Sequence, residues 1–288
     1  MDIPILLETS AFKSLSIKKL EQYNLEGFEI MISPYTFWEL LCHLDEDWTR
    51  NKGQICKCSR VKILDDPRAI NEIDLQYRVE RLNNRVPDNQ LIPGIIECIR
   101  RSDSIDAFYS SNFIDSMGNK RLIIECSTRV REILDERAKE YSNFVKKIRD
   151  YFTQEKHYLD SDKDCHDAIM SLVEGEIKTL RKDSINIQNI HKQVINKYYL
   201  YYAYIFERTK KLLKNGGSQP QRNDYEDGLI CLHLHLNKPL IFVTKDKELS
   251  KALINSLERL QRIGWNSTQH PQIVYKQDGL NLCEIKDS

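Results

Sequence analysis

The chain has 288 residues, which is enough for about two domains or for one domain with a large insertion. Its 41% hydrophobic and 9% aromatic content is ordinary for a globular protein, and this excludes disordered, fibrous and disulfide-miniprotein classes. Basic and acidic residues both number 43, so no overall field attracts the chain to nucleic acid or to an anionic membrane. A polyanionic partner would have to be bound by a local group of cations.

The N-terminus and the cysteines indicate a compartment. The opening MDIPILLETS lacks the basic and then apolar segments of a signal peptide, and the longest apolar run, 198–206, is shorter than the roughly 20 residues of a membrane span. Eight scattered cysteines without a secretory signal are typical of free thiols in a reducing compartment. We therefore expect a soluble, cytoplasmic protein without disulfides and without a membrane partner.

The first 47 residues alternate between strand and helix patterns. The predicted elements are a strand over 3–7, a helix from its cap Ser10 to about Leu20, a strand over 28–32, and a helix from Pro34 to about Leu44 with Ser33 as cap. The end of the chain alternates in the same way. There we predict a helix over 223–236, a strand over 239–243, a helix over 246–260 and a strand over 272–275. This alternation predicts an α/β fold with a doubly wound, mostly parallel sheet.

The middle of the chain has helical spacing and no convincing strand. Helices are predicted near 67–82, 119–157, 162–182 and 184–214, and a linker, GGSQPQ, over 216–221. We therefore expect residues 1–47 and 217–288 to form the two parts of one α/β domain, and residues 48–216 to form a large all-helical insertion.

In doubly wound sheets, ligands bind where the parallel strands end, and five acidic residues are predicted to converge at this edge. Glu8 and Asp246 follow predicted strands, and Glu39 lies on the helix after the second strand. Asp224 and Asp227 open the helix before the 239–243 strand. Converging carboxylates raise one another's pKa, so they stay ionised mainly when a cation neutralises them. Ligands that are all oxygen favour Mg²⁺ or Mn²⁺ over zinc, and a pair of such ions catalyses phosphodiester hydrolysis.

Four segments of the chain resemble, in order, the four acidic motifs of PIN-domain nucleases. They are LLETSAF (6–12), ISPYTFWEL (32–40), NDYEDGLICLHL (223–234) and PLIFVTKDKEL (239–249). The resemblance covers roughly the first 47 and the last 72 residues. It implies that Glu8, Glu39, Asp227 and Asp246 are catalytic, metal-binding acids, with Asp224 as an additional ligand. It also implies that Thr9, Ser10 and Thr244 orient water or phosphate.

The first motif departs from the family pattern, which typically has Asp where this chain has Glu8. The extra methylene moves the carboxylate by more than an ångström, whereas catalytic geometry is held to about 0.5 Å. Two functions therefore stay open. One is a metal-dependent endonuclease acting on single-stranded RNA, where the preference for RNA over DNA comes from the resemblance. The other is an inactive PIN-like module that binds RNA or a protein partner through its helical insertion.

Each acid also has a simpler interpretation. Asp224 and Asp246 could cap helices, and Glu39 could be a solvated helix residue, so only their joint occurrence favours a metal site. The aromatic segment 197–211 could stack on bases, but its aromatics surround the helix, which is more typical of a buried core helix. The cations expected to bind nucleic acid are Arg208, Lys210, Lys211 and Lys214. Whether the protein also forms a homo-oligomer or binds a regulatory protein stays open.

Overall fold

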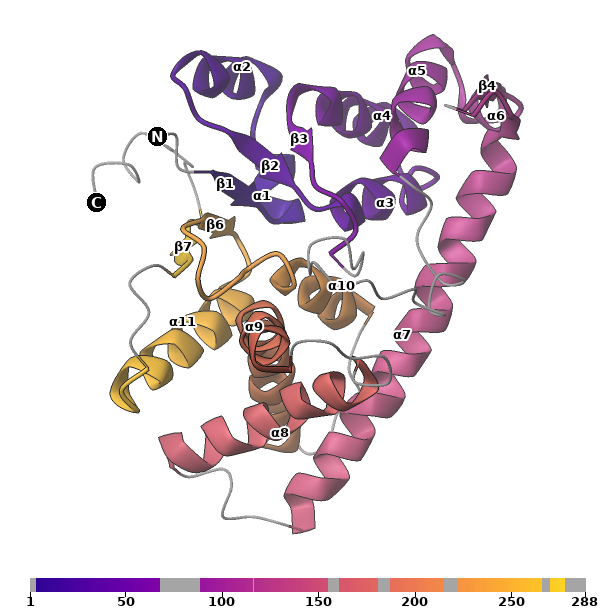
Figure 1. Cartoon of the computed structure of the whole chain (residues 1–288). Helices are drawn as coiled ribbons and strands as arrows, with labels where there is room; N and C mark the ends of the chain where they lie inside the picture. The colour runs from indigo at the N-terminus through magenta and orange to yellow at the C-terminus, as the bar shows by residue number, and fades with distance from the viewer. Residues whose placement is uncertain are drawn as a thin grey trace. The chain divides into compact units, whose positions relative to one another are not determined.

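The structure is a computed structural model that describes residues 4–67, 89–115, 117–154, 161–180, 187–214, 222–265 and 270–277. The chain divides into two compact units. Unit 1 comprises Met1–Asp66, Glu80–Arg137 and Asp278–Ser288, and unit 2 comprises Pro67–Val79 and Ala138–Gln277. One boundary between them falls inside the long helix α7 (Ile123–Gln154), which is drawn as a single rod in Figure 1.

Unit 1 contains three parallel strands in the order β3-β2-β1. They are β1 (Ile5–Leu7), β2 (Ile30–Ile32) and β3 (Lys62–Ile63). The register pairs Ile5 with Ile30 and Met31 with Lys62. Every residue of β1 and β2 is buried, as expected for parallel strands that are covered on both faces.

The helices of unit 1 alternate with these strands and continue after β3. They are α1 (Thr9–Ser14), α2 (Ile17–Leu25), α3 (Pro34–Cys42), α4 (Trp48–Lys57), α5 (Ile92–Arg101), α6 (Ile105–Tyr109) and the first part of α7, with 3₁₀ turns η1 (Cys58–Arg60) and η4 (Asn89–Leu91). The cap of α3 is Ser33, as predicted, and Pro34 opens that helix.

The predicted single helix over 10–20 is wrong in two respects. The backbone at Leu15 is extended and Ser16 caps a second helix, so the segment forms α1 and α2. The residue that caps α1 is Glu8, whose side chain accepts a hydrogen bond from the Ser10 amide, and Ser10 itself lies within the first turn. The sequence favoured Ser10 because serine is a preferred N-cap residue and glutamate is not.

An antiparallel hairpin of β4 (Asn112–Ile114) and β5 (Lys120–Leu122) also lies in unit 1. Together with β3, it corrects the expectation that residues 48–216 contain no strand. Phe113 of β4 packs against α5 so closely that a Cβ atom at Gly94 would overlap its ring. Because Gly94 has no side chain, the hairpin can pack closely against α5 through Phe113.

Unit 2 is built around the helix α9 (Ile187–Lys214), which packs against α8 (Asp162–Leu180), α10 (Arg222–Cys231) and α11 (Lys247–Arg262) (Figure 1). The aromatic segment of α9 is largely buried, with Tyr199, Tyr204 and Phe206 at most 2% exposed. This confirms that the segment is core. The strands β6 (Ile241–Thr244) and β7 (Gln272–Tyr275) pair in parallel, with Ile241 opposite Gln272.

The parallel strands and their connecting helices confirm an α/β class. The predicted helix near 67–82, apart from Pro67, and the linker over 216–221 lie outside the described residues. The division at residues 47 and 216 stays a prediction, and the two compact units divide the chain at other positions. None of the seven cysteines within the described residues forms a disulfide. No described helix combines the length and the apolar character needed to cross a membrane.

Candidate functional site

Glu8 lies directly after β1, as predicted, and caps α1 from a position that is only 6% exposed. Its Oε1 accepts a hydrogen bond from the Ser10 amide at 2.7 Å, and its Oε2 accepts a short hydrogen bond from the Ser10 hydroxyl. Burial raises the pKa of Glu8, and the nearby charge of Glu39 raises it further, while the Ser10 hydrogen bonds lower it. The ionised form of Glu8 would therefore be stabilised by additional positive charge.

Glu39 lies on α3, the helix that follows β2, also as predicted. The ammonium of Lys13, in the last turn of α1, lies 3.2 Å from its Oε1. The Thr9 hydroxyl donates to the Thr36 hydroxyl at 3.2 Å in a buried contact that joins α1 to α3. The structure thus places Glu8 directly after β1 and Glu39 on the helix that follows the adjacent strand β2, close enough for the two charges to interact. It also adds Lys13, which sequence analysis missed.

A buried lysine on α4, Lys57, contacts the C-terminal end of α1. The Lys57 ammonium donates to the carbonyl oxygens of Phe12 at 2.6 Å and Leu15 at 2.8 Å, and lies 4.2 Å from the centre of the Phe12 ring. These carbonyls belong to the C-terminal end of α1, where a cation is favourable. Burial lowers the pKa of Lys57 to about 8. Lys57 therefore holds the helix that carries Thr9, Ser10 and Lys13.

The acids of α10 lie in unit 2 and contact α9. Arg208 donates from Nε to Oδ1 of the buried Asp224 at 2.6 Å. The hydroxyl of Tyr204 lies 3.5 Å from Oδ2 of Asp227, which is a long hydrogen bond. Burial raises the pKa of Tyr204 well above its usual value, and the negative charges of Asp227 and Asp224 raise it further. Asp224 and Asp227 thus lie near one buried phenol, and Asp224 already has a guanidinium partner.

The junction between β6 and α11 holds the last predicted acid. The Oγ1 of Thr244, at the end of β6, accepts a hydrogen bond from the Asp246 amide at 2.9 Å. Asp246 then caps α11, with Oδ1 accepting from the amides of Glu248 at 2.7 Å and Leu249 at 2.9 Å. The position of Asp246 after the strand is as predicted, and the structural alternative of a helix cap also holds.

Two of the four cations expected to bind nucleic acid contact carboxylates. Arg208 pairs with Asp224, and Lys211 lies 2.6 Å from Oε2 of Glu248. Lys210 is partly buried on the same helix, and the side chain of Lys214 is not among those described. A phosphate group would therefore compete with acidic side chains at Arg208 and Lys211.

The five predicted acids fall into two sets. Glu8 and Glu39 belong to unit 1, and Asp224, Asp227 and Asp246 belong to unit 2. Across the part of the chain that the structure describes, no group of three or more His, Cys, Asp or Glu side chains is arranged to hold a metal ion. The five-acid metal site therefore stays a prediction, while the Glu8 and Glu39 pair is a feature of the structure.

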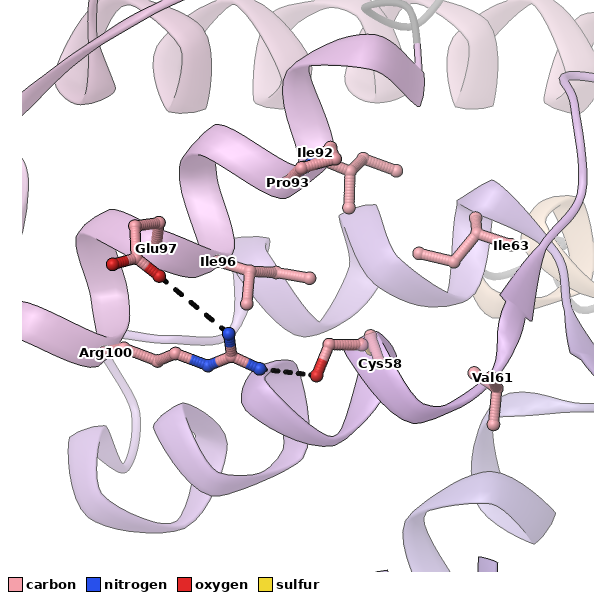
Figure 2. Close-up of a pocket in the computed structure, with 9 residues that line it drawn as sticks. Cys58, Val61, Ile63, Ile92, Pro93, Ile96, Glu97 and Arg100 are labelled. Atoms are coloured by element: carbon pink, nitrogen blue, oxygen red, sulfur yellow. Dashed lines mark hydrogen bonds and ion pairs between the residues drawn. The ribbon is translucent and has the colours of Figure 1, made fainter. Parts of the chain in front are cut away.

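A cavity of about 520 Å³ lies elsewhere in unit 1, between η1, β3 and α5. Its walls are largely apolar, with Ile63, Ile92 and Ile96 among them, and Arg100 lies at one side (Figure 2). Arg100 donates to the Ser59 hydroxyl at 2.5 Å and lies 3.8 Å from the Glu97 carboxylate. Sequence analysis missed this cavity because its lining comes from segments separated by about 30 residues, with no common motif.

The sequence contains signals for the acids but none for their partners. Lys13 and Glu39 are 26 residues apart, and Lys57 and Phe12 are 45 apart, so no local pattern links them. Comparison with family models, with curated proteins and with solved structures finds no match to this chain.

Proposed function

We propose that this protein is a metal-dependent endonuclease of the PIN-like type that hydrolyses phosphodiester bonds, with single-stranded RNA as the favoured substrate. The observation that carries the proposal is the Glu8 and Glu39 pair, which follows two adjacent parallel strands in unit 1. Burial and a neighbouring carboxylate both raise the pKa of Glu8, so a bound cation would stabilise its ionised form. Ligands of this kind suit Mg²⁺ or Mn²⁺.

In this proposal the side chains of unit 1 have distinct roles. Glu8 and Glu39 bind the cation, and the Ser10 hydroxyl and amide hold the Glu8 carboxylate in place. Lys13, beside Glu39, neutralises part of the charge of a substrate phosphate. A bound divalent ion supplies a nucleophilic water at neutral pH and stabilises negative charge on the phosphate. The further ligands Asp224, Asp227 and Asp246, the role of Thr244 and the preference for RNA rest on the sequence resemblance.

A second candidate is an inactive PIN-like module that binds RNA or a protein. A specific observation favours it: Glu39 and Asp224 have Lys13 and Arg208 as ion-pair partners within the chain. A carboxylate neutralised by a protein cation needs no metal ion for its charge to be stable. The two candidates therefore differ in whether a divalent cation stabilises the folded protein.

Thermal unfolding in Mg²⁺, Mn²⁺ or chelator, together with cleavage of labelled RNA and DNA pools, tests the proposal. A ligand that binds only the native state at 100 times its Kd stabilises it by about 2.7 kcal/mol, so the melting temperature should rise with metal. Glu39→Gln should abolish both this rise and cleavage. Glu26→Gln, the same change at an exposed position next to α2, should abolish neither.

The substitutions at Glu8 sharpen the same experiment. Glu8→Asp should preserve or raise cleavage if Glu8 is a longer substitute for the usual Asp, whereas Glu8→Ala should lose it. Equal cleavage by wild type, Glu8→Asp and Glu8→Ala would show that Glu8 binds no metal. RNA binding that is independent of metal, with no cleavage in Mg²⁺ or Mn²⁺, would favour the inactive module instead.

A further inference from the structure

Exposed apolar side chains are concentrated at one place in unit 1. Among the described residues six large hydrophobic side chains are exposed, and four of them lie between positions 114 and 124. These four are Ile114 (63% exposed), Met117 (83%), Leu122 (37%) and Ile124 (45%). We call them the hairpin face. They belong to β4, the turn, β5 and the first turn of α7, which follow one another in the chain. Scattered exposed hydrophobics need no explanation, but a group of exposed apolar side chains in one short stretch is typical of an interaction site.

The register of the hairpin explains why these side chains are exposed. Phe113 and Arg121 are cross-strand neighbours, as are Ile114 and Lys120, so the two pairs lie on opposite sides of the ribbon. Phe113 packs against Gly94 of α5, and the other side therefore carries Ile114 and Leu122 away from α5. A surface hairpin normally places polar residues on its outer side. The outer side of this hairpin instead carries the exposed Ile114 and Leu122 beside the polar Asn112 and Lys120.

Asp115 accepts hydrogen bonds from residues on the far side of the hairpin turn. Its Oδ1 accepts hydrogen bonds from the amides of Met117 at 3.0 Å and Asn119 at 2.8 Å, and its Oδ2 accepts from Arg121 Nε at 2.8 Å. These hydrogen bonds, first of all the one from the Asn119 amide, lower the pKa of Asp115 to about 2. Gly118 supplies the positive φ of +82° that the turn requires. A preorganised surface loses little conformational entropy when it binds.

The charges around the hairpin face favour a neutral partner. Asp115 and Arg121 pair with each other. The exposed Lys120 and Glu125 have opposite signs and flank Leu122 and Ile124 in the sequence. The face therefore has no excess charge to attract an anionic membrane or a nucleic acid, and the whole chain is also neutral. In a two-fold arrangement, each Lys120 can face the Glu125 of the other copy, which makes the surface complementary to itself.

We propose that the hairpin face is an isologous interface between two copies of this chain. Ile114 and Leu122 pack face to face across the two-fold axis, Met117 and Ile124 extend the apolar contact, and Lys120 pairs with Glu125 of the other copy. The contact involves the face of the ribbon and not its edge, because a lysine on an edge strand disfavours pairing with another strand. The interface is independent of the carboxylates and of the proposed catalytic activity.

Sedimentation equilibrium over a range of protein concentrations tests the interface. The full chain should show a reversible monomer and dimer equilibrium, and Ile114→Ser with Leu122→Ser should raise its Kd by roughly tenfold or more. Ile17→Ser with Leu25→Ser removes the two exposed hydrophobics of α2 and should leave the Kd unchanged. Circular dichroism melts verify that both variants fold. A wild-type chain that is monomeric at every soluble concentration, or an equal weakening in both variants, overturns the proposal.

Charge exchange tests the two-fold arrangement and the identity of the partner. Lys120→Glu alone and Glu125→Lys alone should each weaken the dimer, and the double variant should restore it, because every dimer then regains two opposite-charge pairs. A double variant that stays as weak as the single ones overturns the proposed pairing. A monomeric wild type that binds phosphatidylserine vesicles through Ile114 and Leu122 would assign the face to membranes and also overturn the proposal.

Discussion

The β1–α1 and β6–α11 junctions have the same construction, since in each a buried strand is followed by an acid that caps the next helix. They differ in how the acid is held. Glu8 uses both carboxylate oxygens, is 6% exposed and has a raised pKa. Asp246 is partly exposed and accepts two amides with Oδ1. Helix capping thus explains the positions of both acids without a bound ligand. Glu8 differs from Asp246 in being buried.

The largest expected effect comes from an acid at neither junction. Asp227→Asn should reduce metal-dependent RNA cleavage by on the order of 100-fold or more, since even partners of metal ligands contribute 10- to 100-fold. Its melting temperature should stay near that of the wild type, because the substitution removes no volume and Tyr204 can still donate to the amide oxygen. Cleavage rates with Mn²⁺ and thermal melts measure the two effects. Undiminished cleavage would contradict the metal-ligand role.

The next largest expected effect is a loss of stability when Lys57, which contacts the end of α1, is replaced. Lys57→Met removes the donor for the buried carbonyls of Phe12 and Leu15, and should lower the free energy of unfolding by about 1 to 3 kcal/mol. Lys18→Met at an exposed position of α2 should change it by less than about 0.5 kcal/mol. Urea denaturation measures both variants. Equal stability of the two would show that Lys57 does not support α1.

The lowered pKa of Lys57 also predicts a pH dependence. Its pKa is about 8 in the folded protein and about 10.4 in the unfolded chain, so the unfolded state binds more protons between these values. The free energy of unfolding should therefore rise as the pH increases from about 8 to 10.4. This contribution should be absent in Lys57→Met, and denaturation midpoints of both proteins over that pH range measure the difference.

The two caps should respond oppositely to substitution. The pKa of Glu8 is raised, so the folded state binds more protons and the free energy of unfolding falls as the pH rises above about 4.5. Glu8→Gln should remove this fall and raise the melting temperature at neutral pH. Asp246→Ala should instead remove the cap hydrogen bonds and about 1 kcal/mol of stability. Thermal melts in chelator measure both, and destabilisation by Glu8→Gln would show that the cap needs the charged form.

The smallest effect is expected on α9, where Lys211 contacts Glu248 in the first turn of α11. Changing Lys210, Lys211 and Lys214 to Gln should weaken RNA binding and reduce its salt slope by about 0.7 for each phosphate that the protein no longer neutralises. Arg208 is retained in this variant because Asp224 is buried against it. Lys18→Gln with Lys19→Gln is the control. Binding curves that coincide with the wild type from low to moderate salt would show that this face does not contact RNA.

The sequence was sufficient where a local pattern determines the structure. The apolar runs of β1 and β2, Ser33 before Pro34, and Asp246 before α11 are strand and cap signals that act within a few residues. The break at Leu15 was missed because the apolar spacing continues through it. The two-residue strand β3 is defined by its pairing with β2 and has too few residues to show alternation.

In the candidate site too, features set by neighbouring residues could be predicted, and contacts between distant residues could not. The positions of Glu8, Glu39 and Asp246 after strands could be predicted from the order of the motifs. The cations beside the acids could not, because Arg208 and Asp224 are 16 residues apart on different helices and meet only through packing. The buried state of Glu8 also depends on that packing, and no property of the residue itself indicates it.

Gly94 has a consequence for engineering. A glycine in a helix costs up to about 1 kcal/mol relative to alanine, so Gly94, in the first turn of α5, would be an obvious target for thermostabilisation. Here the added methyl group would overlap the Phe113 ring and displace the hairpin from α5. A library that fills helices with alanine would therefore select against the change at this position, even though the helix itself would gain.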